Sequence, residues 1–443
     1  MKTFNIFLTG IFTISFLACN LPFALSSTFS PPSPPPPTPA ALVTISPTRF
    51  LPTNTPKMPT EHQITVRLTG GVGEFIQRLS GEKFVPRGMN YIRLAQQTKI
   101  DGTSTFGHAL FDPGLYDSTR VSSDLQKMHA DGYNVIRVFL SPDTMGISND
   151  GLSSAYMENV VDLLNLAKQN QIFVIFTLDW IPGGKYGEIL NTECCSTFAL
   201  MNANFLPAAG LKANRVFYQD FIRYLLARNA PTDYIFSYQL RNEMFYDSDQ
   251  PPLSLNSGVV KTSNGKSYDL ANPADKELMV AENLVYWLDE MRTAILGVDP
   301  TALVSVGFFI PQAPNPARLG DPRLVVTEPA IWQSSLDFID LHAYPGFELN
   351  LKQHIENFGL KGMQEKPIIM GEFGAEISRF ASIQTAAETL MNWQIESCGY
   401  GFDGWIFWTW DLDEQPEFFN ALMEEGAING VLAPLTRPDP CSP

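Results

Sequence analysis

Two glutamates stand out because each closes a short apolar run. Glu243 ends the stretch YIFSYQLRNE (234–243), and Glu372 follows the three apolar residues of PIIMGEF (367–373). An unpaired carboxylate is costly to bury, so each glutamate is expected to face a cleft or a cationic partner. Two carboxylates across one cleft suit the cleavage of a glycosidic bond, in which one is the general acid and the other the nucleophile.

The elements that must position these glutamates form a repeating pattern of apolar runs and amphipathic stretches. The expected strands are 83–92, 134–140, 172–180, 234–243, 303–309, 337–345, 367–373 and 404–410. The stretch SAYMENVVDLLNLAKQN places Val160, Leu163, Leu164 and Ala167 on one helical face. Apolar strands covered by helices indicate a parallel sheet, and eight such units favour a single α/β (β/α)8 barrel, the TIM-barrel fold. An open doubly wound sheet is disfavoured because no GxGxxG turn follows the first strand.

Two further segments are expected to form hairpins. Residues 64–84 alternate in polarity as a short N-terminal β-hairpin does, and this hairpin is expected to cover the N-terminal end of the barrel. The long polar segment after Glu243 contains Asn264-Gly265, a strong hairpin-turn signal, and is expected to form a wall of the cleft.

In a barrel of this kind the chemistry lies at the C-terminal ends of the strands. The other candidates at those ends are Arg137, Asn242, His342, Tyr344 and Trp408. Glu372 is expected to remain ionised beside Arg137. A less polar setting and the charge of Glu372 are expected to raise the pKa of Glu243. Asn242 is expected to hydrogen-bond a sugar hydroxyl, and Trp408 offers a flat face on which a sugar ring can stack.

Six short motifs carry a family resemblance. They are RGMNY (87–91), NVIRVFL (134–140), RNE (241–243), HAY (342–344), GEFG (371–374) and WIFWTW (405–410). Their order over residues 64–435 resembles the glycoside hydrolases of clan A, and family 5 in particular. The resemblance implies a retaining mechanism, with Glu243 as acid/base and Glu372 as nucleophile. It places Arg137, Asn242, His342, Tyr344 and Trp408 at supporting positions.

The third expected strand departs from this family pattern. Many members carry a histidine at its end, whereas this chain has Asp179 and Trp180 in FTLDWIP. Trp180 is expected to supply a stacking surface at a sugar subsite, in the style of mannanase-like relatives. The substrate is therefore expected to be a β-linked polysaccharide or oligosaccharide, with β-glucan and β-mannan, and endo and exo action, all left open.

The composition and the absence of several motifs argue against other classes of function. The net charge of −16 argues against a nucleic-acid partner. The chain has no HExxH, GxSxG or GxxxxGK[ST] motif, so neither a metal nor another cofactor is expected. Two alternatives remain, a non-catalytic carbohydrate-binding surface lipoprotein and a transglycosylase that uses the same residues. A fold of two α/β lobes, or the loss of one of the two glutamates, would favour the binding lipoprotein. Analysis of the reaction products would distinguish the transglycosylase from a hydrolase. A monomer is the default expectation.

The N-terminal region is expected to lie outside the fold. Residues 1–18 read as a lipoprotein-type signal peptide, because Lys2 precedes an apolar run and FLAC resembles a bacterial lipobox with Cys19 as the lipidated residue. Ordinary secretion with cleavage after Ser26 is the alternative. Residues 19–62 are a Pro/Ser/Thr-rich linker and residues 63–443 the catalytic domain. The expected location is extracellular or at the cell surface, with a lipid anchor in a bacterial membrane.

The cysteines other than Cys19 are expected to lie in an oxidising compartment, where disulfides can form. Cys194, Cys195, Cys398 and Cys441 allow three pairings, and the sequence does not choose among them.

Replacing the predicted lipid-bearing residue tests the anchor. Cys19→Ser is expected to move the chain from the membrane fraction to the soluble fraction, because the thiol that would carry the lipid is lost. Membrane fractionation of the full chain, with Ser26→Ala as the matched control, measures this. A Cys19→Ser chain that sediments with membranes as the wild type does would contradict the prediction.

Overall fold

The computed structural model describes residues 59–98, 104–146, 151–194, 196–312 and 314–442. The predicted signal peptide, Cys19 and residues 19–58 of the predicted linker lie outside the described residues. Within the described ranges, no helix combines the length and the apolar character needed to cross a bilayer.

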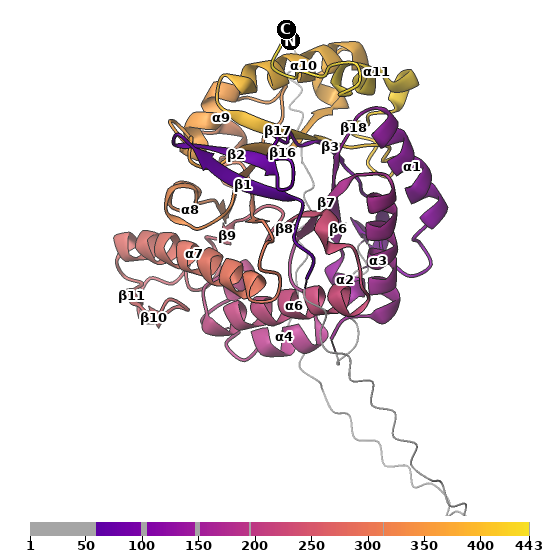
Figure 1. Ribbon diagram of the computed structural model, residues 1–443. Helices are drawn as coiled ribbons and strands as arrows, with labels where there is room; N and C mark the ends of the chain where they lie inside the picture. Colours follow the sequence, from indigo (N-terminus) through magenta and orange to yellow (C-terminus); the bar gives the residue numbers. More distant parts are fainter. Residues whose placement is uncertain (1–58, 99–103, 147–150, 195, 313, 443) are drawn as a thin grey trace, which may run out of the picture. The chain divides into compact units, whose positions relative to one another are not determined.

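A ring of parallel strands forms the centre of the catalytic unit (Figure 1). The strands are β3 (Arg87–Asn90), β6 (Val135–Leu140), β7 (Phe173–Leu178), β8 (Ile235–Gln239), β12 (Val304–Ser305), β13 (Gly307–Phe308), β15 (Ile339–His342), β16 (Ile368–Glu376) and β17 (Phe402–Trp408). β12 and β13 are two halves of one predicted strand, separated by Val306. Because β12 pairs with β8 and β13 pairs with β15, this split strand closes the ring. The predicted (β/α)8 barrel is confirmed.

Helices cover the outside of the strands (Figure 1). The main ones are α1 (Ser118–Ala130), α3 (Ser154–Gln169), α6 (Ala208–Ala227), α7 (Pro273–Leu296), α9 (Leu351–Phe358), α10 (Ile383–Cys398) and α11 (Met423–Leu432). Shorter helices are α2 (Pro142–Met145), α4 (Gly184–Leu190), α5 (Leu200–Phe205) and α8 (Glu328–Gln333). In α3 the predicted apolar face is the buried one, and Ser153 caps the first turn by accepting a hydrogen bond from the Tyr156 N–H.

The N-terminal hairpin closes the barrel below the strands. It consists of β1 (Ile64–Thr69) and β2 (Val72–Gln77). The ring of Phe75 lies 5.1 Å from that of Phe236 and 5.3 Å from that of Phe338, both at the beginnings of barrel strands. The predicted position of this hairpin is confirmed. His62, which the sequence analysis assigned to the linker, is fully buried and contacts Asp299, so the packed unit begins at or before this residue.

Further short strands lie in the loops between barrel elements. The turn at Asn264-Gly265 joins β10 (Val259–Lys261) to β11 (Ser267–Asp269), as predicted, and Gly265 has a φ of +81° that suits glycine. The hairpin of β4 (Leu94–Thr98) and β5 (Ser104–His108) was not predicted. β9 (Tyr246–Asp247) pairs with β14 (Arg323–Leu324), and β18 (Phe418–Phe419) pairs with β16.

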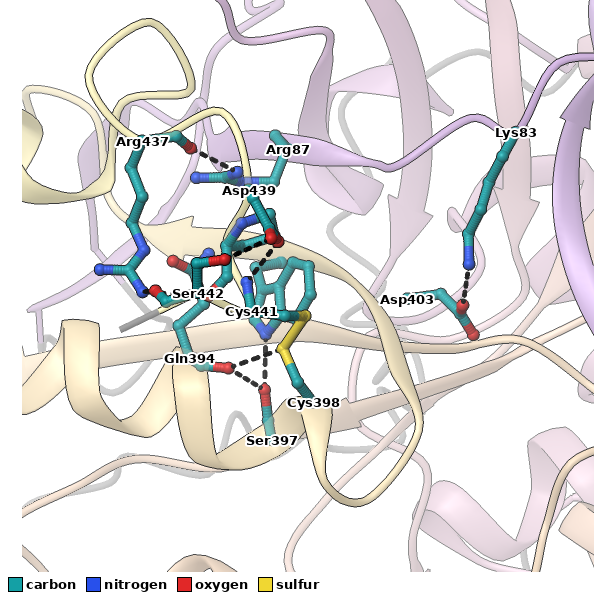
Figure 2. Close-up of a disulfide and its surroundings, with 12 residues drawn as sticks. Lys83, Arg87, Gln394, Ser397, Cys398, Asp403, Arg437, Asp439, Cys441 and Ser442 are labelled. Carbon is teal, nitrogen blue, oxygen red and sulfur yellow. Dashed lines mark hydrogen bonds and ion pairs between the residues drawn. A yellow bond between two sulfur atoms is a disulfide. The ribbon is translucent and has the colours of Figure 1, made fainter.

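A disulfide joins Cys398, at the end of α10, to Cys441 in the C-terminal tail (Figure 2). The same tail is held by Arg87, whose guanidinium donates to the carbonyls of Leu432 at 2.7 Å and Arg437 at 3.2 Å. Cys194 is also disulfide-bonded, and Cys195 lies outside the described residues. The structure therefore selects one bond that the sequence left open.

Removing the tail disulfide is expected to destabilise the barrel without changing its catalytic face. The bond closes a loop with a sequence separation of 43 residues, so Cys398→Ser with Cys441→Ser should lower the free energy of unfolding by about 2–4 kcal/mol. Denaturant unfolding measures this, with the reduced wild type as the control. Activity should not change, because Cys398 lies before β17 begins and the strand ends of the cleft lie opposite. Equal stability of the oxidised wild type and the double variant would contradict the prediction.

Candidate active site

Glu372 lies on β16 between a cation and a phenol. Its Oε1 is 2.7 Å from Nη1 of Arg137, on β6, and its Oε2 accepts a hydrogen bond of 2.8 Å from the Tyr344 hydroxyl. The side chain of Glu372 is 5 % exposed. Both carboxylate oxygens are therefore held by a donor.

Arg137 is fully buried and surrounded by acceptors. Its other contacts are to Asn90 Oδ1 (2.8 Å), Gln239 Oε1 (2.9 and 2.6 Å), Asn242 Oδ1 (2.6 Å) and Thr177 Oγ1 (3.4 Å). These acceptors come from the ends of β3, β7 and β8 and fix the guanidinium plane. Because the amide oxygen of Asn242 is engaged by Arg137, its N–H groups remain to donate to a substrate, as the sequence suggested.

Glu243 follows β8 and has a more open position, with 26 % of its side chain exposed. Burial against the cleft wall raises the pKa of its carboxyl to about 7, while the Arg323 guanidinium opposes this rise and the Asp179 carboxylate adds to it. The predicted direction of the shift is confirmed. The contributing negative neighbour is Asp179, whereas the sequence analysis expected Glu372.

His342 lies between the two glutamates. Its Nδ1 is 3.2 Å from Glu243 Oε1 and 3.5 Å from Glu372 Oε2. Burial lowers the pKa of this imidazole to about 3, so the ring is neutral at ordinary pH. A neutral ring that faces two carboxyl groups with one nitrogen can donate a single proton to them, and this keeps the two glutamates apart in a fixed geometry.

The same three side chains could offer ligands to a metal. Glu243, His342 and Glu372 each present one oxygen or nitrogen atom, and these atoms lie within 4.8 Å of one another. Each of these side chains already has a hydrogen-bond partner in the protein, and Arg137 supplies a positive charge at Glu372. The three side chains and Arg137 therefore form one charged and hydrogen-bonded cluster.

The aromatic residues border this cluster. Trp408 is 8 % exposed, packs edge-on against Phe139 at 5.9 Å, and donates from its indole nitrogen to Gln415 Oε1 at 2.9 Å. Only a narrow strip of the ring therefore reaches solvent, less than the open stacking face that the sequence suggested. Trp180 is half-buried in the loop after β7.

A histidine does lie beside the end of β7, although it comes from another part of the chain. His108, the last residue of β5, has its Nε2 3.6 Å from Asp179 Oδ2 and stacks on Phe139 at 3.8 Å. Arg241 lies 3.5 Å from the other oxygen of Asp179. A histidine from the unpredicted β4–β5 hairpin thus contacts the aspartate that follows β7.

Sequence reasoning missed several polar residues of this site. Gln239 and Asp340 are fully buried next to Arg137 and His342. Asp340 stands two residues before His342, so strand alternation places both side chains on one face and could have indicated it. His108 comes from the β4–β5 hairpin and Arg323 from β14, which pairs with the distant β9, and the sequence carries no signal for their positions.

The chain matches one protein-family model. The family model described as cellulase (glycosyl hydrolase family 5) matches residues 91–414. No curated protein sequence matches the chain.

Solved structures share the fold at low identity. An endo-1,4-β-mannanase from Rhizomucor miehei superposes with a TM-score of 0.58 at 17 % identity, covering 85 % of this chain and 100 % of that one. An exo-β-1,4-mannosidase from Opitutaceae bacterium strain TAV5 superposes with a TM-score of 0.57 at 16 % identity, covering 85 % of this chain and 63 % of that one. An endo-β-1,4-mannanase from Thermotoga petrophila superposes with a TM-score of 0.53 at 15 % identity, covering 81 % of this chain and 77 % of that one. The family-model match extends over most of the chain, and the chain belongs to glycoside hydrolase family 5.

Proposed function

We propose that this glycoside hydrolase cleaves a β-linked polysaccharide with retention of anomeric configuration, using Glu372 as nucleophile and Glu243 as acid/base. One observation carries the proposal. Carboxylate oxygens of the two residues lie within 4.8 Å of each other, and both carboxyl groups face Nδ1 of His342. Retaining enzymes hold their carboxyl groups about 5–5.5 Å apart, whereas inverting enzymes need about 6.5–9.5 Å to admit a water molecule.

The two environments support two different roles. In the first step Glu372 attacks the anomeric carbon, the glycosidic C–O bond breaks, and protonated Glu243 delivers its proton to the leaving oxygen. In the second step Glu243, now a carboxylate, takes a proton from water, whose oxygen attacks the anomeric carbon and releases Glu372. A carboxyl with a pKa near 7 can both give and take this proton at neutral pH.

The substrate to test first is β-1,4-mannan. The structural neighbours named above are two mannanases and a mannosidase, and the half-buried Trp180 follows the C-terminal end of β7, where an aromatic ring could contact a sugar. β-Glucan is the second candidate, because the matching family model is described as a cellulase.

Conservative replacement of each glutamate is expected to separate their roles. Glu372→Gln should reduce turnover to background, because no covalent intermediate can form. Glu243→Gln should lower kcat by about 10²–10⁴-fold on polymers and far less on aryl glycosides, whose leaving groups need no proton. Hydrolysis of mannan, β-glucan and xylan panels measures this. Glu376→Gln, on the same strand but hydrogen-bonded to Ser378 outside the cluster, is the matched control.

Three outcomes of this assay would contradict the proposal. Unchanged activity in Glu372→Gln would remove the nucleophile assignment. Carbohydrate binding without cleavage of any polymer by the wild type would favour the binding lipoprotein, and transfer products in place of free sugars would indicate a transglycosylase.

The charges around Glu243 predict opposite shifts of the pH profile. Glu243 must be protonated as the acid, so kcat/KM should fall as pH rises through its pKa of about 7. Asp179→Asn removes a charge that raises this pKa and should move the alkaline limb to lower pH. Arg323→Gln removes a charge that lowers it and should move the limb to higher pH. Profiles of kcat/KM against pH measure both, and shifts of the same sign would contradict the assignment.

A further inference from the structure

A second buried acid lies directly beneath the two glutamates. Asp340, on β15, is fully buried, and the proposed reaction gives it no role. Its Oδ2 accepts a hydrogen bond from Nε2 of Gln239, and the Gly371 N–H donates to the carboxyl group. A Cβ on residue 371 would lie 1.9 Å from Asp340 Oδ1, so the glycine beside the nucleophile leaves the space that this acid occupies. The site is built to hold a carboxyl group at this position.

One connection runs from Asp340 to the nucleophile. The Oε1 of Gln239 accepts from both Nε and Nη2 of Arg137, at 2.9 and 2.6 Å. This fixes the amide orientation, since the oxygen must face Arg137 and the N–H2 group must face Asp340. Arg137 in turn pairs with Glu372 at 2.7 Å. An acceptor at Asp340 Oδ2 therefore holds the amide that orients the guanidinium.

A second connection runs from Asp340 to His342. The proton of this neutral ring belongs on Nδ1, because that nitrogen faces the carboxyl groups of Glu243 and Glu372. The Nε2 atom is then a bare acceptor. It is buried without a hydrogen-bond partner, and so is Asp340 Oδ1, which lies 3.9 Å away.

The protonation state of Asp340 decides whether these two atoms repel or attract. An ionised carboxylate would set two lone-pair acceptors against each other in a buried site, which is costly. A neutral carboxylic acid can direct its O–H at Nε2 and still accept from Gln239. Burial raises the pKa of Asp340 to about 7, with Arg137 opposing the rise and Glu372 adding to it. The charged and polar groups that face it are Arg137, Glu372, His342 and Gln239.

We propose that Asp340 is a positioning residue that acts as a neutral acid: it holds His342 in the tautomer that donates from Nδ1 toward both glutamates, and through Gln239 it holds Arg137 against Glu372. The catalytic part of this inference rests on the proposed glycosidase function. The tautomer of His342 does not, because it is a property of the protein without substrate.

Two replacements of nearly equal size test the proposal. Asp340→Asn keeps an oxygen for Gln239 and places an N–H2 group toward Nε2, so it reproduces the neutral acid. Asp340→Leu removes both. At about pH 6, below the pKa of Asp340, nitrogen NMR of the histidine rings should show His342 protonated on Nδ1 in the wild type and in Asp340→Asn. His342→Gln identifies the signal, and Asp340→Leu should lose this tautomer preference.

Kinetics give the second readout. Asp340→Asn should keep kcat within about threefold of the wild type, and Asp340→Leu should lower kcat by about 100-fold with little change in KM, because the reacting groups are misplaced while the sugar contacts remain. An Nε2-protonated His342 in the wild type would overturn the inference. So would an inactive Asp340→Asn chain that retains the Nδ1 proton, or an Asp340→Leu chain that loses thermal stability but neither kcat nor the tautomer.

The two readouts keep this inference separate from the proposed function. A wild type that cleaves no polymer would remove the function and leave the NMR test standing. If Asp340→Leu does not fold, Asp340→Asn decides alone, because the proposal requires both the Nδ1 proton and near-normal turnover in that variant.

Discussion

The burial of the Arg137 charge constrains the whole catalytic face. A guanidinium without water needs a negative partner and an acceptor for each donor, and removing one member of such a pair costs about 3–5 kcal/mol. Glu372 supplies the charge, and oxygens come from Asn90 at the end of β3 and from Gln239 and Asn242 at the end of β8. Because these residues come from strands far apart in the chain, the network forms only when the ring of strands is closed. Glu372 is therefore positioned by the same contacts that satisfy the buried guanidinium at the strand ends.

Environment, and not residue type, distinguishes the two glutamates. Glu372 sits inside the network, with one oxygen on Arg137 and the other on Tyr344. Glu243 sits at its edge, partly exposed, and burial raises its pKa to about 7. His342 connects them and is itself kept neutral by burial. A barrel suits this division because adjacent and opposite strand ends lie at similar depth, so one carboxyl can be enclosed while another faces the cleft.

Residues from the loops between the barrel elements add further charged and polar groups around the site. The β4–β5 hairpin brings His108 to Asp179, and the β9–β14 pairing brings Arg323 toward Glu243. These contacts add charge around Glu243. Arg137, Asn242, His342, Tyr344 and the two glutamates, which the sequence motifs indicated, lie together at the strand ends.

The sequence by itself determined the eight strands, the bottom hairpin and the two glutamates. These follow from local signals, because apolar runs, turn residues and strand-end carboxylates can be recognised within a few positions of one another. Only the tertiary structure decided that His108 meets Asp179, that Cys398 pairs with Cys441, and that Gln239 and Asp340 connect Arg137 to His342. Apart from Asp340 and His342, which are neighbours on one strand, these contacts join residues about 40 to 100 positions apart, and they depend on strand register and loop path. A residue's pKa likewise depends on which distant charges and how much burial the fold brings to it.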